Sequence, residues 1–496
     1  MNKFNKIQYY NLIIPVILVL SLFIFYEGLD LPGTMYWIGL LHPVLFYLTI
    51  WPVIKKYQQS RNWLTISNAV LILIYIYIGL GSVNYIYFYD YIPHSTLKNP
   101  DIALKSFLFC VIGTVFYRLG SEMKLTKNVV SILPKLPKTP PWGKSIRFSI
   151  LFGISVTVLI NIFFIVKGNY GFFLNTEDVT VPAYYSLLHY FSLFGQIAIV
   201  IGSYYWYLGA PLKNYDKLFI VICVSLLIAF GLLYGMKAHV LRVLIMFLIP
   251  YIILGIYKIR KKNISKVYLI LLPILFLIFW ILNPLYRGEL KFYSSTKNIL
   301  SVPRSFYVGT KTGIKKNIYA MYGEAPLKIA SQNIWSRVSL FHYFSAVVSQ
   351  TPSIYNYRNW DRYKYLPFSP FIPRVLWPSK PRNDQASIFN VRYISDIWNS
   401  TTPTTFGWAY LEYGIISIMM LMFLLGLVAN VIQSYTINTT LSLSSIILFT
   451  MLFNSLFNLE ADPYWIISGI PKTIITVVIA YWLLIKLPGE LIWENT

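Results

Sequence analysis

The sequence has few cysteines for its length. Only two occur among 496 residues, and both Cys110 and Cys223 lie inside apolar runs. This usage argues against a disulfide framework, a cysteine-based zinc site and a covalently attached haem. We expect both thiols to be packing residues.

Charged residues are scarce as well, and their balance is one-sided. They make up 12% of the chain against 56% hydrophobic residues, a composition that no soluble domain can bury and that predicts a polytopic membrane protein. There are 42 Lys and Arg against 18 Asp and Glu, a net charge of +24. The basic residues stand between apolar runs, so we expect anionic lipid headgroups and phosphates as partners rather than nucleic acid.

Nucleotide-binding and metal-binding patterns are missing from the sequence. There is no Walker Gly-Lys-Ser/Thr loop and no Gly-x-Gly-x-x-Gly. The nearest approach to a Mg²⁺ site is Glu27 with Asp30, which we interpret as solvated charges. We therefore expect no cofactor and no metal, and an outward-facing enzyme would need a preactivated, membrane-borne substrate.

Twelve apolar runs are long enough to cross a bilayer core, which needs about 20 residues per helix. They are 10–26, 34–54, 64–88, 102–119, 147–167, 186–208, 217–236, 239–258, 267–283, 405–432, 441–459 and 464–485. The first run has no small-residue cleavage signal, so we expect it to be a retained span. The loops between the runs alternate between basic and acidic, and the basic ones are assigned to the cytoplasm. Both termini are then cytoplasmic.

The predicted fold class is all-α: a polytopic membrane protein of about 12 transmembrane helices with one large extracytoplasmic loop. Helices 1–9 occupy residues 1–283, the loop spans 284–404, and helices 10–12 occupy 405–496. The loop carries sixteen Lys and Arg against five Asp and Glu. The positive-inside rule does not predict so many cations outside, so we expect them to bind an anion. Apolar residues at helical spacing over 334–348 predict an amphipathic helix on the outer surface.

Several cations fall at the outer membrane boundary. Arginine binds phosphate oxygens bidentately and lysine adds a point charge, so together they form a candidate diphosphate clamp. Alternatively, each side chain snorkels to a lipid headgroup. The set is Lys237, Arg242, Arg287, Arg337, Arg374, Lys380 and Arg382.

The acid–base candidates are Glu412, His342, Asp384 and Asp396. Glu412 lies ~10 Å into the tenth run, where an ionisable side chain is either functional or paired with an outer-loop arginine. His342 is either catalytic or a packed histidine. The aromatic residues of the loop either stack on sugar rings or pack the proline-rich segment; they are Trp360, Tyr363, Tyr365 and Trp377.

The layout and five segments resemble the O-antigen polymerase and ligase superfamily, above all its oligosaccharide repeat-unit polymerases. The segments are Gly235-Met-Lys237, Tyr286-Arg287-Gly288, Arg337 to Pro352, Phe371-Ile-Pro-Arg-Val-Leu-Trp-Pro-Ser-Lys-Pro-Arg382 and Thr402-Pro-Thr-Thr-Phe-Gly407. Two positions depart from the family pattern. Lys237 stands where an arginine is common, and Trp408 stands where an acidic residue often follows the glycine, which puts the general base in doubt.

The resemblance implies a GT-C-like glycosyltransferase architecture in the bacterial cytoplasmic (inner) membrane. It implies transfer of glycan from undecaprenyl diphosphate to a sugar hydroxyl of another lipid-linked unit, with inversion and without a metal. Arg287 would stabilise developing charge, and Glu412 or His342 would act as base. A flippase and a chain-length regulator are the expected protein partners. Two alternatives stay open: a ligase that moves finished glycan to another acceptor, and a non-enzymatic transporter or flippase, which would favour an internal pseudo-symmetry that we do not find.

Overall fold

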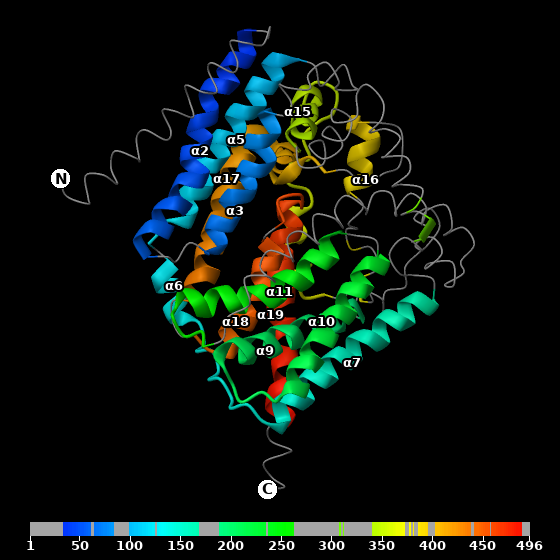
Figure 1. The fold of residues 1–496 in the computed structure, drawn as a ribbon. Coiled ribbons are helices and arrows are strands. Elements are labelled where there is room, and N and C mark those ends of the chain that lie inside the picture. The colour runs from blue at the N-terminus through cyan, green and yellow to red at the C-terminus, as the bar shows by residue number, and fades with distance from the viewer. Residues whose placement is uncertain are drawn as a thin grey trace, which may run out of the picture.

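A computed structural model describes fifteen stretches of the chain. They are residues 33–60, 64–83, 99–124, 126–167, 188–234, 237–261, 307–308, 311, 340–372, 376–377, 380, 385–394, 402–437, 441–456 and 458–488. Every regular element within these stretches is helical (Figure 1). Nine of the described helices are long and apolar enough to cross a membrane. The protein therefore has the make-up of an all-helical, multi-pass membrane protein.

The elements follow the predicted apolar runs closely. They are α2 (Gly33–Ser60), α3 (Ile66–Ile74) with η1 (Tyr75–Leu80), α5 (Pro100–Ser121), α6 (Thr126–Ile132), α7 (Lys144–Val166), α9 (Phe194–Leu208), α10 (Asn214–Tyr234), α11 (Lys237–Ile256), α15 (Phe341–Gln350), η6 (Tyr363–Tyr365), α16 (Gln385–Phe389), η7 (Asn390–Ile394), α17 (Thr404–Thr436), α18 (Leu443–Leu456) and α19 (Pro463–Tyr481) with η8 (Trp482–Lys486). The predicted runs 10–26 and 267–283 lie outside the described residues. The run 441–459 forms only the 14-residue α18, which at 1.5 Å per residue is shorter than a ~30 Å bilayer core.

Local sequence explains where several helices begin. Asn99 precedes Pro100, and its side-chain oxygen accepts hydrogen bonds from the amides of Asp101 and Ile102 at 3.0 and 3.3 Å. Asp462 caps α19 in the same way, because its carboxylate accepts from the Tyr464 amide at 2.9 Å ahead of a first-turn proline. These caps satisfy amides that have no partner within the helix.

Helices α5 and α17 pack along each other and form the centre of the upper half of Figure 1. Two glycines allow their backbones to touch. A Cβ built on Gly120 would lie 2.1 Å from the Phe423 carbonyl oxygen, and one on Gly426 would lie 2.1 Å from that of Tyr117. Small residues at such crossings are typical of packing between membrane helices.

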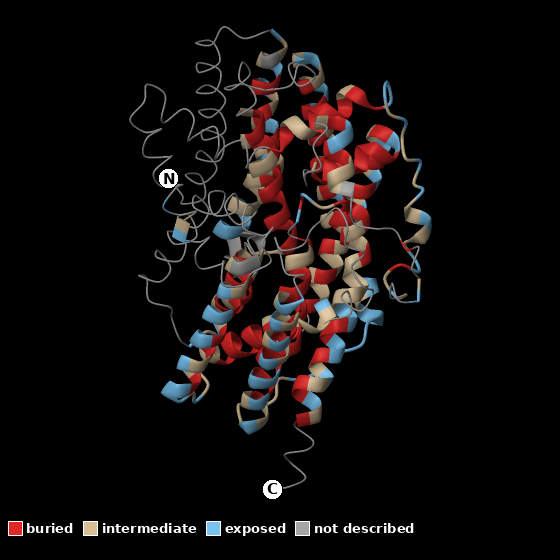
Figure 2. Cartoon of the chain, turned by 90° about the vertical axis from the view of Figure 1, so that its right-hand side faces the viewer, coloured by how far each residue is buried: buried red, intermediate tan, exposed pale blue. Residues whose placement is uncertain are grey.

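Burial separates the inner faces of the helices from their outer faces (Figure 2). Large apolar side chains remain exposed on the outer faces, among them Leu159 (67%), Leu218 (61%) and Val478 (61%). In water such a surface would be unfavourable, whereas facing lipid it costs nothing.

The basic loops that the sequence assigns to one side of the membrane meet at one end of the bundle. Pro134 and Thr139, in the loop after α6, accept hydrogen bonds from Tyr435 at the end of α17 and from the Leu443 amide. The Lys261 amide donates to Tyr207, which joins the ends of α11 and α9. These contacts fit the predicted alternation of loops, and the assignment of this end to the cytoplasm stays a prediction.

The longest described helix of the large loop is α15, and its position differs from the expected one. It spans Phe341–Gln350 and packs against α5 and α17, with Phe341 and Phe344 fully buried. The prediction that it lies on the outer surface is wrong, because apolar and small residues cover most of its circumference and seven of its ten residues are buried. Residues 334–339 lie outside the described part.

Candidate functional site

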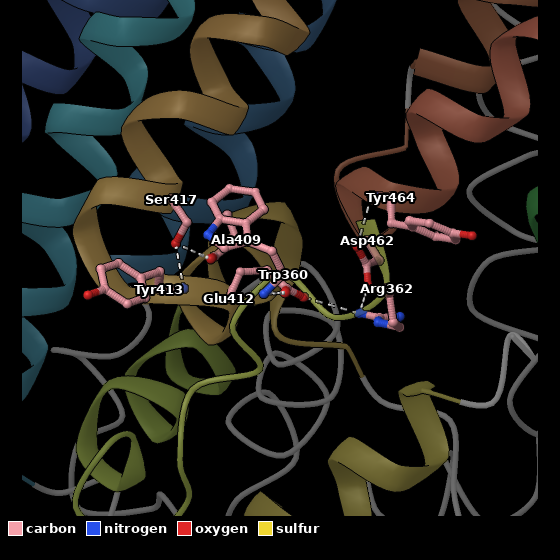
Figure 3. Close-up of polar contacts among 8 residues, drawn as sticks. All are labelled: Trp360, Arg362, Ala409, Glu412, Tyr413, Ser417, Asp462 and Tyr464. Carbon is pink, nitrogen blue, oxygen red and sulfur yellow. Dashed lines mark hydrogen bonds and ion pairs between the residues drawn. The ribbon is translucent and has the colours of Figure 1, made fainter. Parts of the chain in front are cut away.

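Four charged residues meet where the segment 351–372 of the large loop packs against α17 and α19. We call Arg358, Arg362, Glu412 and Asp462 the charge cluster, and Figure 3 shows the last three of them. The arginines come from the loop, Glu412 comes from α17, and Asp462 is the N-cap of α19. The cluster thus joins three parts of the chain that are separated by 50 to 100 residues.

A break in α17 places Glu412. The backbone leaves helical geometry at Tyr413 (φ −159°, ψ 43°) and Gly414 (φ 67°, ψ −143°). The second pair of angles is open almost only to glycine. Glu412 is consequently the last residue of the first half-helix.

The polar groups freed by this break have partners. Ser417 Oγ accepts from the Tyr413 amide at 2.9 Å and lies 2.7 Å from the Ala409 carbonyl oxygen. The loop satisfies two more of the freed backbone groups: the amides of Arg358 and Asn359 donate to the carbonyls of Leu411 and Glu412 at 2.8 and 3.0 Å. The loop backbone is therefore docked into the break, as irregular backbone inside a membrane protein requires.

Arg362 bridges the two carboxylates of the charge cluster. It donates to Asp462 Oδ2, and its Nη2 lies 3.5 Å from Glu412 Oε1. The other Glu412 oxygen accepts from the Trp360 amide at 3.1 Å. Glu412 is 0% exposed, Asp462 3% and Arg362 13%, so the charges are held away from water. Buried charges of this kind persist only when they are paired.

The two arginines have different electrostatic surroundings. Burial alone would lower the pKa of Arg362, but the Asp462 and Glu412 carboxylates reverse this and raise it. Burial, followed by repulsion from Arg362, lowers the pKa of Arg358. The Arg358 guanidinium lies 5.1 Å from the centroid of the Trp408 ring, a cation–π contact that stabilises a cation outside water.

The charge cluster and the aromatic residues next to it contain hydrogen-bond donors that no described residue satisfies. They are Arg358 Nη1, Arg362 Nε and Nη1, Tyr363 Oη, Tyr464 Oη and Trp465 Nε1. Buried donors normally have an acceptor, so a group of orphaned donors indicates room for water or for a ligand rich in oxygen atoms. The two guanidinium groups suit phosphate or carbonyl oxygens best.

Of the sequence candidates, Glu412 belongs to the charge cluster. Its surroundings are those of the alternative interpretation, an ion pair with an outer-loop arginine. Trp360 and Tyr363 lie beside it, and their rings pack edge-to-face at 5.0 Å, while Tyr363 packs on Tyr464 at 5.7 Å. Trp377 packs on Tyr365 at 5.5 Å. These contacts are those of a packed aromatic cluster, and sugar stacking stays a prediction for any face that remains open.

The other described candidates lie elsewhere. Lys380 is 8% exposed, and its ammonium donates to the carbonyl oxygens of Ser369 and Ile372 at 2.5 and 2.8 Å. His342 is on α15, with its ring centroid 3.9 Å from that of Tyr343. Arg242 is in the second turn of α11, within electrostatic reach of His189 and His239. Lys237 begins α11, and Arg287, Arg337, Arg374 and Arg382 lie outside the described residues together with Asp384 and Asp396.

Sequence reasoning missed Arg358, Arg362 and the role of Asp462. The signal was present in Arg358-Asn-Trp-Asp-Arg362, where two arginines four residues apart flank a tryptophan. Asp462 precedes Pro463, and Asp before proline is a common helix start. What could not be inferred was the pairing, because it depends on the loop docking into a helix break.

The fold and the charge cluster define a class: multi-pass helical membrane proteins in which an extramembrane loop is fastened to a broken span by buried ion pairs. Residues 169–488 match the family described as a domain of unknown function, DUF8712, and the chain belongs to this family. The matched region includes all four residues of the charge cluster. No curated protein and no solved structure matches the chain.

Proposed function

We propose that the protein polymerises lipid-linked oligosaccharide repeat units on the outer face of the bacterial cytoplasmic membrane. The observation that carries the proposal is the charge cluster, in which carboxylates fix one guanidinium and an aromatic ring supports a second, and both keep N–H groups that find no acceptor among the described residues. This arrangement suits the diphosphate of a polyprenyl-linked donor, which carries its negative charge at the membrane boundary.

The chemistry proposed is a single inverting displacement. The acceptor hydroxyl oxygen forms a bond to the anomeric carbon, while the bond from that carbon to the diphosphate oxygen breaks and its electron pair leaves with the diphosphate. Because negative charge grows on the leaving group, preorganised cations in a partly dry site lower the barrier. Arg358 and Arg362 are placed for this role, with Arg287 as the further candidate from sequence.

The hydroxyl proton must pass to a base. Glu412 is fully buried and already binds Arg362 and the Trp360 amide, so in the described conformation it positions the loop and does not reach a substrate. His342, half-buried on α15, is the other candidate that the structure describes. Glu412 acts as the base only if the loop leaves the break.

A transporter of anionic lipid-linked glycan is the second candidate function. The break in α17 favours it, because discontinuous spans frequently form the binding sites of transporters. Here, however, loop amides and Ser417 satisfy the freed backbone groups. This explains the break through loop docking and leaves the polymerase as the better interpretation.

The decisive experiment uses the purified full-length protein in proteoliposomes with one lipid-diphosphate-linked repeat unit. We expect a ladder of longer lipid-linked glycans without added nucleotide sugar, and the ladder should persist in EDTA because side-chain cations supply the positive charge. A single product on an unrelated acceptor would indicate a ligase. Failure of any transfer with the confirmed native substrate, together with movement of that lipid between leaflets, would indicate transport.

A pair of variants tests whether formation of the glycan ladder depends on the charge cluster. Arg358→Gln removes a guanidinium that is in no ion pair with either carboxylate, so folding should survive. Loss of one such transition-state contact typically lowers kcat by about 10²–10³-fold. Arg392→Gln, at an exposed position of η7, is the matched control and should leave the ladder unchanged. Equal turnover of both variants would contradict the role of Arg358.

A further inference from the structure

A groove lies between α7 and α10, at the end of the bundle opposite to the charge cluster. It has a volume of about 390 Å³ and its wall is mainly apolar, formed by Ile150, Leu151, Phe219 and Ile220. Its location follows from the Leu443 amide, which bonds Thr139 just before α7 and lies past the far end of α17 from Glu412. The groove is therefore separate from the site of the proposed function.

One end of the groove holds a fixed guanidinium. Arg147 pairs with Asp216 through Nε–Oδ1 at 2.9 Å and Nη2–Oδ2 at 3.0 Å. The rings of Trp142 and Tyr215 lie 5.7 and 5.5 Å from its central carbon. Asp216 is 5% exposed and also accepts from the Lys213 amide at 2.9 Å, so the partner that orients Arg147 is itself held. This is a built polar site and not a mobile surface side chain.

The arginine still has binding capacity. Asp216 engages Nε and Nη2 only, and Arg147 remains 35% exposed. Three lysines stand on the helix ends that form this end of the groove: Lys144 begins α7, Lys213 lies 5.7 Å from the Tyr215 ring, and Lys217 is on the first turn of α10. With one buried carboxylate among four cations, the end of the groove is strongly positive.

The surroundings of the groove are those of a membrane interface. Tyr215 and Leu218 are 55% and 61% exposed, and Leu151, on the rim, is 51% exposed. Aromatic rings and lysines followed along the helix by exposed aliphatic side chains mark the level at which headgroups give way to acyl chains. A ligand that matches the groove has a chain of methylenes below an anionic head.

We propose that the groove binds an anionic phospholipid of the surrounding leaflet. One acyl chain lies along Leu151 and Ile220, and the phosphate contacts Arg147 with help from Lys144 and Lys213. The occupant is a lipid and not a second copy of the chain, because the positive end calls for an anion and the wall beneath it is mainly apolar. The two kinds of cation then have different roles: the arginine sets the position of the phosphate, and the lysines select for net negative charge.

Native mass spectrometry of the full-length protein tests this, with phosphatidylglycerol and phosphatidylcholine offered in equal amounts. Wild type should retain phosphatidylglycerol preferentially. Lys144→Gln and Lys213→Gln should each weaken its retention about fivefold, whereas Lys135→Gln, on the exposed loop before α7, should not. Leu151→Trp fills the apolar part of the groove and should weaken retention of both lipids. Leu159→Trp, on the lipid-facing side of the same helix, is its control.

Three results would overturn the proposal. The first is lipid retention by Leu151→Trp equal to that of Leu159→Trp, and the second is equal retention of the two lipids whatever the lysines. The third is conversion of a dimer to a monomer by Leu151→Trp. The last would show that a second copy covers the groove. All variants leave the Arg147–Asp216 pair intact, so loss of folding does not obscure the outcome.

Discussion

Arg362 is the residue on which the described part of the large loop depends most. It stands between two carboxylates that belong to different helices, and none of the three side chains is more than 13% exposed. Such a buried ion pair adds little to the free energy of unfolding compared with well-packed apolar side chains in its place. Removing one partner, however, leaves a buried uncompensated charge, which is costly.

Replacing Arg362 by alanine should therefore destabilise the protein by about 3–5 kcal/mol. Arg362→Lys should destabilise the protein by less than Arg362→Ala, because an ammonium keeps the charge but not the planar fork of N–H donors that reaches both carboxylates. The measurement is the unfolding midpoint of the detergent-purified protein. Asp361→Asn, next to it but 78% exposed in a surface pair with Lys364, is the control and should be neutral. An Arg362→Ala midpoint equal to that of the control would show that the ion pairs do not fasten the loop.

Gly414 is the second residue that we expect to tolerate substitution poorly, because its backbone conformation and surroundings suit only glycine. Its φ of 67° is unfavourable for any side chain, and a Cβ there would lie 2.9 Å from the Tyr357 hydroxyl oxygen. Gly414→Ala should cost about 1–3 kcal/mol in the same unfolding assay. Tyr357→Phe in the Gly414→Ala background should recover only the steric part, because the backbone strain remains. Full recovery would mean that the torsion angles are not the constraint.

At the scale of elements, hydropathy located the nine described helices that are long enough to span a membrane, but not their interruptions. The apolar run 405–432 predicts one continuous helix, and α17 covers it, but the break at Tyr413 and Gly414 carries no hydropathy signal. The glycine alone was ambiguous, since Gly407 and Gly426 in the same run are helical. The break becomes explicable only with the loop amides in place, which is a tertiary effect.

The same reasoning explains the misplaced loop helix. Apolar spacing over 334–348 indicated a helix correctly in part, but spacing alone does not tell lipid surface from protein interior. Phe341 and Phe344 are fully buried against α5 and α17. The charge cluster was likewise half visible: Glu412 stood out by its depth, whereas Arg362 looked like one loop cation among sixteen.

The close contact of α5 and α17 gives a prediction at this scale. Gly426→Ala places a methyl group 2.1 Å from the Tyr117 carbonyl oxygen, so the helices must separate. We expect the unfolding midpoint to fall, with a loss of about 1–3 kcal/mol in the free energy of unfolding, as for an overpacked core. Gly469→Ala is the matched control, because a Cβ there meets nothing within 4 Å and alanine favours helix. If both variants unfold alike, the glycine contact does not set the spacing of the two helices.

At the scale of the whole molecule, charge and contacts describe the same two ends. Two loops that are basic in sequence contact helix ends at one end of the bundle: Pro134 and Thr139 bind the ends of α17 and α18, and Lys261 binds the end of α9. The charge cluster lies at the opposite end. A membrane placed across the bundle then separates the positive loops from the large loop. In this predicted orientation the large loop is basic on the less favoured side, as expected if its cations bind an anion.

This arrangement predicts which cysteines a membrane-impermeant thiol reagent reaches in intact cells. The native Cys110 and Cys223 are buried and give a low background. A cysteine at Ser353, exposed in the large loop, should be labelled from outside, whereas one at Lys138, exposed between α6 and α7, should react only after the membrane is opened. Detergent-solubilised samples, in which both sites must react, provide the control for accessibility. The reverse pattern would place the charge cluster in the cytoplasm. The proposed polymerase would then have lost its outer-leaflet substrate, and the groove beside Arg147 would face the outer leaflet.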